Sequence, residues 1–281
     1  MDIYTQKKSL EGALKAYRKN QKIGFVPTMG ALHSGHVSLV EKALQENDCV
    51  VISIFVNPTQ FNNTEDLKKY PRTLDDDIAL LKKIKGNIII FSPDASEIYN
   101  NKIVSKNYNF SGLENEMEGK HRNGHFDGVG TVLNILFRII QPNTAYFGEK
   151  DFQQLQIVKK LVEIEKLPVK IIGCQIVREK NGLAMSSRNK RLTTKQFEES
   201  AIISEVLKEV KQKFNKLSIS ELNLMVKERF LNNSTLDLEY FEIAYENTLK
   251  TVKQKSKKNY YRAFIAAFAG EVRLIDNMPL N

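Results

Sequence analysis

Residues 23–36 read IGFVPTMGALHSGH, a strand-like apolar run followed at once by a glycine-containing turn and two histidines three residues apart. The run 23–26 predicts a strand, and the spacing of apolar residues behind it predicts a helix over 36–45. A helix that opens directly after a strand offers unpaired N–H groups and its positive dipole end to an anion. Gly30 and Gly35 let a ligand approach the backbone closely. The segment therefore predicts an α/β fold with an anion-binding turn.

The rest of the N-terminal part repeats this strand and helix alternation. Further apolar runs of strand length lie at 49–56, 88–91, 144–147 and 169–176, and helical patterns lie at 74–85, 126–140 and 152–165. Continuous apolar runs are typical of strands covered on both faces. We therefore predict a Rossmann-like, doubly wound parallel sheet in a catalytic domain over residues 1–176, with ligands beyond the carboxyl ends of its strands.

The pattern changes after residue 176. Helical patterns at 194–214 and 220–231 precede strand patterns at 238–245, 261–269 and 272–275. This order predicts a smaller C-terminal α+β domain over 177–281, which we expect to help close the active site. The lysine-rich stretch 250–258 is interpreted as a solvated hairpin connection. A nucleic-acid contact is the alternative, but no aromatic side chain is interleaved among these charges.

Composition narrows the class of protein. The chain has 281 residues, 42% of them apolar, which is enough for a sizeable core, and its net charge of +9 favours anionic partners. Cys49 and Cys174 lie in apolar runs, which indicates a reducing compartment rather than a disulfide scaffold. We find no run of apolar residues of signal-peptide or membrane-spanning length, so we expect a soluble, cytoplasmic protein.

The two histidines of the opening segment are candidates for phosphate binding. His33 and His36 lie on one side of the first helical turn, where each ring can donate a hydrogen bond to a phosphate oxygen. A zinc pair and a buried capping histidine are the alternatives. Zinc is disfavoured because His121 and His125 belong to a separate segment and no cysteine completes a tetrahedral set nearby.

Two further segments carry groups suited to phosphates. Met185-Ser-Ser-Arg188-Asn follows the fifth predicted strand and a turn at 181–182, and its hydroxyls and guanidinium suit phosphate oxygens. On its own, this segment would be an ordinary polar loop. Gly148-Glu-Lys150-Asp151 follows the fourth strand at a helix start, where Lys150 can reach a phosphate and Asp151 can equally cap the helix.

The remaining motifs suit a small polar substrate and a metal ion. Asn57-Pro-Thr-Gln60-Phe61 combines two amides with an apolar wall, although a plain turn is the alternative. Tyr70-Pro-Arg-Thr precedes three aspartates at 75–77. These carboxylates can coordinate a Mg2+ carried by ATP, or they can simply be first-turn acids of a helix.

The paired histidine and serine–arginine motifs resemble the nucleotidyltransferase superfamily with its His-x-Gly-His signature. The five segments, in their order along the chain, resemble the motifs of the pantothenate synthetase (pantoate–β-alanine ligase) family over about residues 25–192. The resemblance implies an ATP-dependent ligase that condenses (R)-pantoate with β-alanine to pantothenate, through a pantoyl adenylate and with release of AMP and pyrophosphate. It also implies ATP as a substrate, Mg2+ and a homodimer, with neither nucleic acid nor membrane as a partner.

The resemblance also implies roles for residues at matching motif positions. Catalytic roles would fall to His33, His36, Lys150 and Arg188. ATP would be bound by Met29, Gly30, Ala31, Leu32, His33, Ser34, Gly35, His36, Gly148, Glu149, Lys150, Asp151, Val177, Met185, Ser186, Ser187 and Arg188. Pantoate would be bound by Pro27, Met29, Gln60, Phe61 and Gln154, β-alanine by Gln60, and Mg2+ by Asp76 and Asp77.

Two other functions stay open at this point. One is an adenylyltransferase of the same superfamily that releases a nucleotide-linked product. The other is a non-enzymatic RNA-binding protein that uses the basic C-terminal surface. We also expect residues 115–126, which contain two glycines and two cations, to form a mobile cover in which Arg122 contacts the substrate carboxylate.

Overall fold

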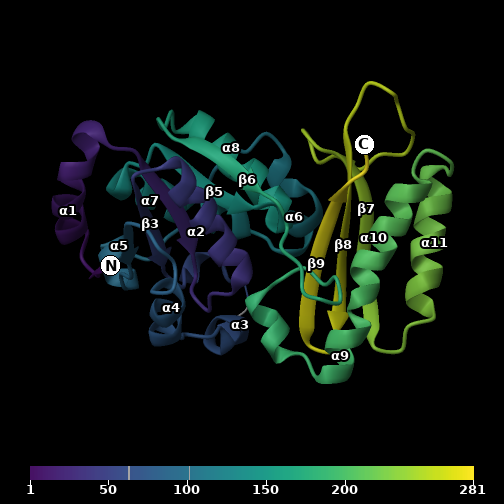
Figure 1. Ribbon diagram of the computed structural model, residues 1–281. Coiled ribbons are helices and arrows are strands. Elements are labelled where there is room, and N and C mark those ends of the chain that lie inside the picture. The colour runs from purple at the N-terminus through teal and green to yellow at the C-terminus, as the bar shows by residue number, and fades with distance from the viewer. Residues whose placement is uncertain (63, 101) are drawn as a thin grey trace. The chain divides into compact units, whose positions relative to one another are not determined.

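The computed structural model describes residues 1–62, 64–100 and 102–281, which form two compact units (Figure 1). The first unit comprises Met1–Glu149 and Gln153–Gln175, and the second comprises Lys150–Phe152 and Ile176–Asn281. No helix in the described part of the chain is both long enough and apolar enough to span a bilayer.

The first unit is built on a six-stranded sheet. Its strands run in the order β1 (Asp2–Tyr4), β4 (Ile88–Phe91), β3 (Cys49–Ile54), β2 (Ile23–Thr28), β5 (Thr144–Gly148) and β6 (Lys170–Cys174). All neighbouring pairs are parallel. The predicted doubly wound α/β fold is therefore confirmed. The short edge strand β1 was not predicted, because two exposed residues and one half-buried residue carry no periodic signal.

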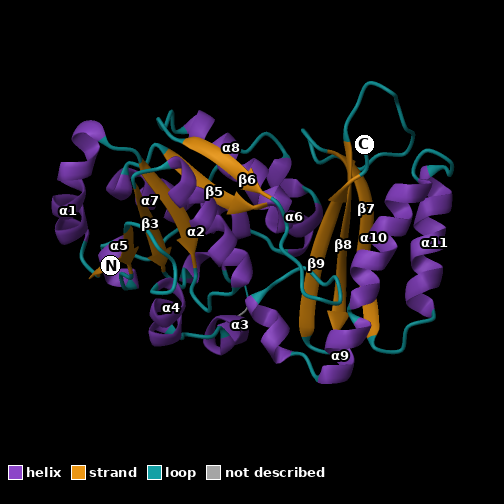
Figure 2. Ribbon diagram, viewed as in Figure 1, coloured by secondary structure: helices purple, strands orange, loops and turns teal. Residues whose placement is uncertain are grey.

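Helices pack around this sheet (Figure 2). They are α1 (Lys7–Asn20), α2 (Ser34–Glu46), α3 (Thr64–Lys69), α4 (Leu74–Leu81), α5 (Ala95–Tyr99), α6 (Met117–His121), α7 (His125–Ile140) and α8 (Phe152–Ile164). Short 3-10 turns lie at η1 (Pro58–Gln60), η2 (Leu113–Asn115) and η3 (Glu149–Asp151). Every residue of β3 and β4 is buried, as the continuous apolar runs predict for strands covered on both faces.

The second unit places helices before strands, as the sequence predicts. The 3-10 turn η4 (Ser187–Arg191) leads into α9 (Thr194–Glu199), α10 (Ala201–Lys213) and α11 (Ile219–Leu231). An antiparallel sheet follows, in the order β7 (Leu236–Tyr245), β8 (Tyr261–Ala269) and β9 (Val272–Pro279). Figure 2 shows α10 and α11 side by side against this sheet. Their buried face includes Val206, Leu207 and Leu222, and it forms one core with β8.

The prediction of one continuous helix over 194–214 is wrong at Ser200. This buried residue ends α9 and lies before the first residue of α10, and its hydroxyl donates to the Gln196 carbonyl at 2.6 Å. A serine that bonds back to the preceding turn competes with the helical hydrogen-bond ladder. The periodicity of apolar residues continues through Ser200, so the sequence pattern could not reveal the break between α9 and α10.

The lysine-rich stretch 250–258 connects β7 to β8, as predicted. One of its lysines has a structural contact within the unit. The Lys255 ammonium donates to the carbonyls of Phe214 and Leu217, and it lies 4.8 Å from the centre of the Phe214 ring. This charge therefore neutralises carbonyl groups behind the end of α10.

Candidate functional site

The topology of the first sheet fixes where its ligand should bind. From β2 the chain moves through β3 to β4 on one side, whereas β5 and β6 lie on the other side of β2. The boundary between β2 and β5 is thus the point where the strand order reverses, and in open α/β sheets ligands bind beyond the carboxyl ends of such strands. The turn 29–33 follows β2 there, and Gly148 ends β5.

A buried aspartate holds the turn that follows β2. The Asp77 carboxylate, 2% exposed, accepts hydrogen bonds from the N–H groups of Ala31 at 2.9 Å and Leu32 at 2.7 Å. Gly30 and Ala31 have φ angles of +78° and +50°. A β-carbon on Gly30 would lie 3.0 Å from Asp77 Oδ2. The charge-assisted bonds offset the strain of this left-handed turn and fix its shape.

This geometry bears on the two roles left open for the acidic cluster. Asp77 anchors the turn through both carboxylate oxygens, while Asp76 is exposed. Within the ranges that the structure describes, no group of three or more histidines, cysteines or carboxylates could hold a metal ion. Asp77 therefore has a structural role in the turn, and the predicted contact of Asp76 and Asp77 with Mg2+ stays a prediction.

The two histidines cap helix α2 with their ring Nδ1 atoms. His33 Nδ1 accepts from the Gly35 N–H at 3.1 Å, and His36 Nδ1 accepts from the His33 N–H at 3.3 Å. The ring centroids lie 4.1 Å apart. A neutral imidazole that accepts through Nδ1 carries its proton on Nε2. The capping role and the predicted phosphate role are therefore compatible, because these capping bonds use only the Nδ1 atom of each ring.

The turn after β3 is a hydrogen-bonded network rather than a plain turn. The buried Asn57 donates from Nδ2 to Gln60 Oε1 at 3.1 Å and to the Gly128 carbonyl at 3.3 Å. Its Oδ1 accepts from the Tyr99 hydroxyl at 2.5 Å and from the Thr59 hydroxyl at 3.0 Å. Burial raises the pKa of Tyr99 to about 12, so the phenol stays a donor at neutral pH. The network fixes the side chain of Gln60.

The turns after β2 and β3 meet at their predicted substrate residues. Gln60 Nε2 lies 3.2 Å from Met29 Sδ. Phe61 contacts Tyr70 edge to face, with ring centroids 5.7 Å apart. Pro27 is in β2, two residues before Met29. An amide, a thioether and an aromatic ring therefore come from neighbouring strand ends, a combination that suits a small molecule with polar and apolar parts.

Helix α7 and the segment before it pack on the same turn. His125 Nδ1 lies 2.8 Å from the Gln60 carbonyl, to which Arg122 also donates at 3.3 Å. Gly128 approaches so closely that a β-carbon there would lie 2.3 Å from the Thr59 carbonyl oxygen. The guanidinium of Arg122 thus contacts the main chain of the turn. The predicted mobile-cover role of residues 115–126 stays a prediction.

A glutamine that the sequence did not single out holds this segment. Gln153, which is buried, accepts from the Glu118 N–H at 3.0 Å and donates to the carbonyls of Leu113 at 2.8 Å and Glu116 at 2.7 Å. The predicted substrate residue Gln154 is its half-buried neighbour. The sequence gives no local signal for Gln153, because its partners lie 35 to 40 residues earlier.

The other predicted phosphate residues belong to the second unit. Val177 and Met185 are joined by a backbone hydrogen bond of 3.0 Å across a hairpin that turns at Gly182, whose φ is +94°. The hairpin leads into η4, where the Ser186 hydroxyl accepts from the Arg188 N–H at 3.3 Å. Ser187 is buried. Lys150 is 20% exposed in its side chain, and its ammonium lies 4.0 Å from the Asp151 carboxylate.

Known proteins resemble the whole chain. A family model described as pantoate-beta-alanine ligase matches residues 2–279. The chain is 54% identical to the pantothenate synthetases of Flavobacterium psychrophilum, over 281 residues, and of Christiangramia forsetii, over 282 residues, with 100% of each chain covered.

Two solved structures extend the likeness to the fold. The pantothenate synthetase of Thermus thermophilus has a TM-score of 0.92 and 36% identity, covering 100% of this chain and 99% of that one. The pantoate-beta-alanine ligase of Francisella tularensis, solved with beta-gamma ATP and beta-alanine, has a TM-score of 0.82 and 39% identity, covering 100% and 98%.

Proposed function

Because the chain belongs to the pantoate–β-alanine ligase family and is an enzyme of that class, we propose that it joins (R)-pantoate to β-alanine through a pantoyl adenylate. The two histidines that cap the start of α2 carry this proposal. Their Nε2–H groups and the helix N-terminus lie beyond a strand end, where an anion is expected. The ligands named for the Francisella tularensis relative, beta-gamma ATP and beta-alanine, support ATP and β-alanine as substrates.

In the first step, a carboxylate oxygen of pantoate attacks the α-phosphorus of ATP, and pyrophosphate leaves. Negative charge builds on the phosphate oxygens, so fixed donors aimed at them lower the barrier. His33 and His36 would stabilise the α-phosphate, while Lys150 and Arg188 would bind the departing phosphates. The remaining nucleotide contacts would come from Met29, Gly30, Ala31, Leu32, Ser34, Gly35, Gly148, Glu149, Asp151, Val177, Met185, Ser186 and Ser187.

The pantoate site combines amides with apolar walls. Gln60, held by Asn57, and Gln154 would bind the two hydroxyl groups of pantoate. Met29, Phe61 and Pro27 would face its two methyl groups. These contacts leave the pantoate carboxylate to react with ATP.

In the second step, the β-alanine amine attacks the carbonyl carbon of the adenylate, and AMP leaves. Gln60 would also contact the incoming β-alanine. The chemistry requires no covalent bond to the enzyme, and Cys49 and Cys174 lie outside every motif. Mg2+ would arrive bound to the phosphates of ATP, where the exposed Asp76 could contact it while Asp77 holds the turn, and we assign no step to the ion. We also propose a homodimer, which light scattering of the purified protein would test.

The proposal is tested by pantoate-dependent exchange of pyrophosphate into ATP. The wild-type enzyme should catalyse exchange with pantoate but not with other hydroxy acids, and adding β-alanine should yield pantothenate with AMP. The His36→Ala variant should lose roughly a hundredfold or more in exchange rate. The exposed His121→Ala variant is the matched control and should retain exchange. A stable adenylylated product would instead identify an adenylyltransferase.

A further inference from the structure

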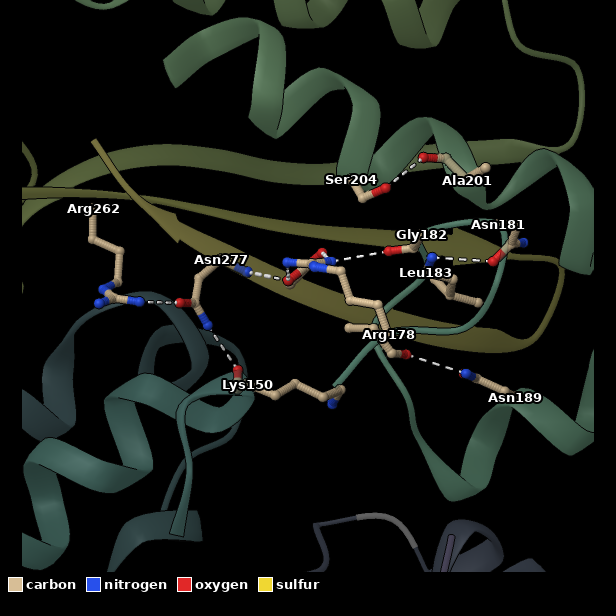
Figure 3. Close-up of polar contacts among 12 residues, drawn as sticks. Lys150, Arg178, Asn181, Gly182, Leu183, Asn189, Ala201, Ser204, Arg262 and Asn277 are labelled. Carbon is tan, nitrogen blue, oxygen red and sulfur yellow. Dashed lines mark hydrogen bonds and ion pairs between the residues drawn. The ribbon is translucent and has the colours of Figure 1, made fainter. Parts of the chain in front are cut away.

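Two consecutive residues of β9 hold two different phosphate-binding segments of the second unit. Figure 3 shows Asn277 facing the backbone oxygen of Lys150, with the lysine side chain extending away from this contact. The neighbouring Asp276 binds the guanidinium of Arg178. Arg178 lies in the hairpin that leads to Ser186 and Arg188. A single strand therefore connects to both sources of phosphate-binding groups.

The contact to Lys150 is made by a side chain that is itself locked. Asn277 is 1% exposed, and its Nδ2 donates to the Lys150 carbonyl at 2.9 Å. Its Oδ1 accepts from Arg262 at 2.7 Å. The Arg262 guanidinium lies 3.8 Å from the centre of the Phe152 ring and donates to Glu246 at 2.8 Å. With both ends of the amide bonded, Asn277 fixes the main chain at Lys150 in one position.

The contact to the hairpin is a buried ion pair. Arg178 donates to Asp276 Oδ2 at 2.6 Å and to Oδ1 at 3.1 Å, while the carboxylate is completely buried. The same guanidinium donates to the Gly182 carbonyl at 3.0 Å, which ties it to the turn of the hairpin. Asp276 also accepts from the Asn277 N–H at 2.8 Å. The two contacts therefore share one rigid frame (Figure 3).

The free-energy cost of burying Asp276 and Arg178 indicates that their ion pair contributes more to conformation than to stability. Burial raises the pKa of the Asp276 carboxyl, while Arg178 opposes this shift by favouring the charged form. A buried ion pair contributes little net stability, because desolvation offsets the attraction between the charges. Its bidentate geometry does restrict the hairpin to one conformation. This points to placement of the hairpin as its main contribution.

We infer that Asp276 and Asn277 are positioning residues that hold the Lys150 segment and the Ser186–Arg188 segment in the register needed to bind one triphosphate. The inference rests on the proposed function, since it assumes that both segments bind the phosphates of ATP. Neither residue needs to touch the substrate. Their effect should be much larger in the half-reaction that handles the triphosphate, because pantoyl adenylate has no β- or γ-phosphate.

The test measures the two half-reactions separately in isosteric variants. Asn277→Asp keeps an acceptor for Arg262 but replaces the donor to Lys150 with an oxygen, and Asp276→Asn removes the charge opposite Arg178. Each should lower pantoate-dependent exchange by about tenfold to a hundredfold, as expected for misplaced binding groups. Release of pantothenate from synthetic pantoyl adenylate and β-alanine should stay within about twofold of wild type.

The matched control is Arg273→Gln on the same strand. It breaks a partly exposed ion pair to Glu239, 2.6 Å long, and should leave both half-reactions within about twofold. If Asn277→Asp does not fold by circular dichroism, Asn277→Ala replaces it under the same criteria.

The outcomes separate this inference from the proposed function. No exchange by the wild-type enzyme would overturn the proposed function. Normal exchange by the wild type and by folded Asp276 and Asn277 variants would overturn this inference alone. An equal loss of rate in both half-reactions would also overturn this inference, because it would indicate a general loss of folded enzyme.

Discussion

Asp77 binds the backbone N–H of Leu32 through a hydrogen bond of 2.7 Å, although 45 residues separate them in the sequence. The first turn of α4 thereby fixes the turn from which α2 and its histidines begin. The acidic cluster at 75–77 has the composition of a metal site, yet its one buried member serves the protein backbone. The shape of the turn proposed to bind phosphate thus depends on a carboxylate from another element.

Removing this carboxylate should destabilise the fold and slow adenylate formation. In Asp77→Ala, two buried N–H groups lose a charged acceptor, which we expect to lower the free energy of unfolding by about 2–4 kcal/mol. Urea denaturation measures this value. Exposed Asp75→Ala, in the same helical turn, should change it by less than about 0.5 kcal/mol. Rescue of Asp77→Asn exchange by excess Mg2+ would contradict the anchoring role.

Gly128→Ala should disturb the proposed pantoate site by displacing the backbone of η1. The new β-carbon would lie 2.3 Å from the Thr59 carbonyl and 2.8 Å from the Gln60 nitrogen, so η1 must move. We expect a loss of about 1–3 kcal/mol in the free energy of unfolding and a raised KM for pantoate. Steady-state kinetics with varied pantoate measures the second effect.

The control for this substitution is Gly12→Ala in the exposed face of α1. Among the described residues, no atom outside the local backbone lies within 4 Å of a β-carbon at Gly12. The variant should be more stable by about 0.5–1 kcal/mol, the helix propensity difference between glycine and alanine. Equal kinetic effects of both variants would argue against steric displacement of η1.

Glu165 should contribute stability that disappears in acid. Lys106, at 2.5 Å, and Arg138, at 2.8 Å, lower the pKa of its carboxyl. Because the folded pKa is below the unfolded value of about 4.3, the contribution is complete above that pH and is lost as the pH falls through the folded pKa. Both cations are more than half exposed, so it should not exceed about 1 kcal/mol.

Denaturation of Glu165→Gln at neutral and acidic pH tests this sign. The variant should be less stable than wild type near neutrality, and the difference should disappear as the pH falls through the lowered pKa of Glu165 in the folded state. Glu163→Gln breaks only an exposed pair with Lys160 and should show no such trend. A difference that grows in acid would refute the assignment.

Both cysteines should resist alkylation in the native enzyme. Burial, together with the charge of Asp48, raises the pKa of Cys49 to about 11, and burial also raises the pKa of Cys174. Little thiolate exists at about pH 8, so iodoacetamide should modify neither residue until the chain is unfolded. Mass spectrometry before and after denaturation counts the adducts. If iodoacetamide rapidly modified a cysteine of the native enzyme and abolished activity, the proposed mechanism, which uses no thiol, would be contradicted.

Features of the fold that depend on residues close together in the sequence could be predicted. Apolar runs locate the buried strands to within a few residues, and the motifs between them identify the family that the comparisons confirm. The sequence also places His33 at a helix start, since a strand–glycine–helix succession is local. The edge strand β1 could not be predicted, because three residues are too few to show a periodic pattern.

Long-range polar contacts could not be predicted in this way. Tyr99 reaches Asn57 from 42 residues away, and Asn277 reaches Lys150 from 127 residues away. Such partners depend on how the chain folds back on itself, and an ordinary asparagine or tyrosine in a strand or helix gives no sign of them. The capping role of the histidines was left open for the same reason, because only hydrogen-bond geometry shows which ring nitrogen caps the helix.

Residues Lys150–Phe152 are embedded in the sequence of the first unit yet belong to the second. Phe152 stacks under Arg262 and lies 6.0 Å from the ring of Phe264, so it fills a place in a core assembled more than 100 residues later. The second unit is consequently not a transferable module. A fragment that begins at residue 176 would lack Phe152, and a chimera that exchanges the C-terminal part between relatives must also carry a compatible tripeptide at 150–152, which precedes that part in the sequence.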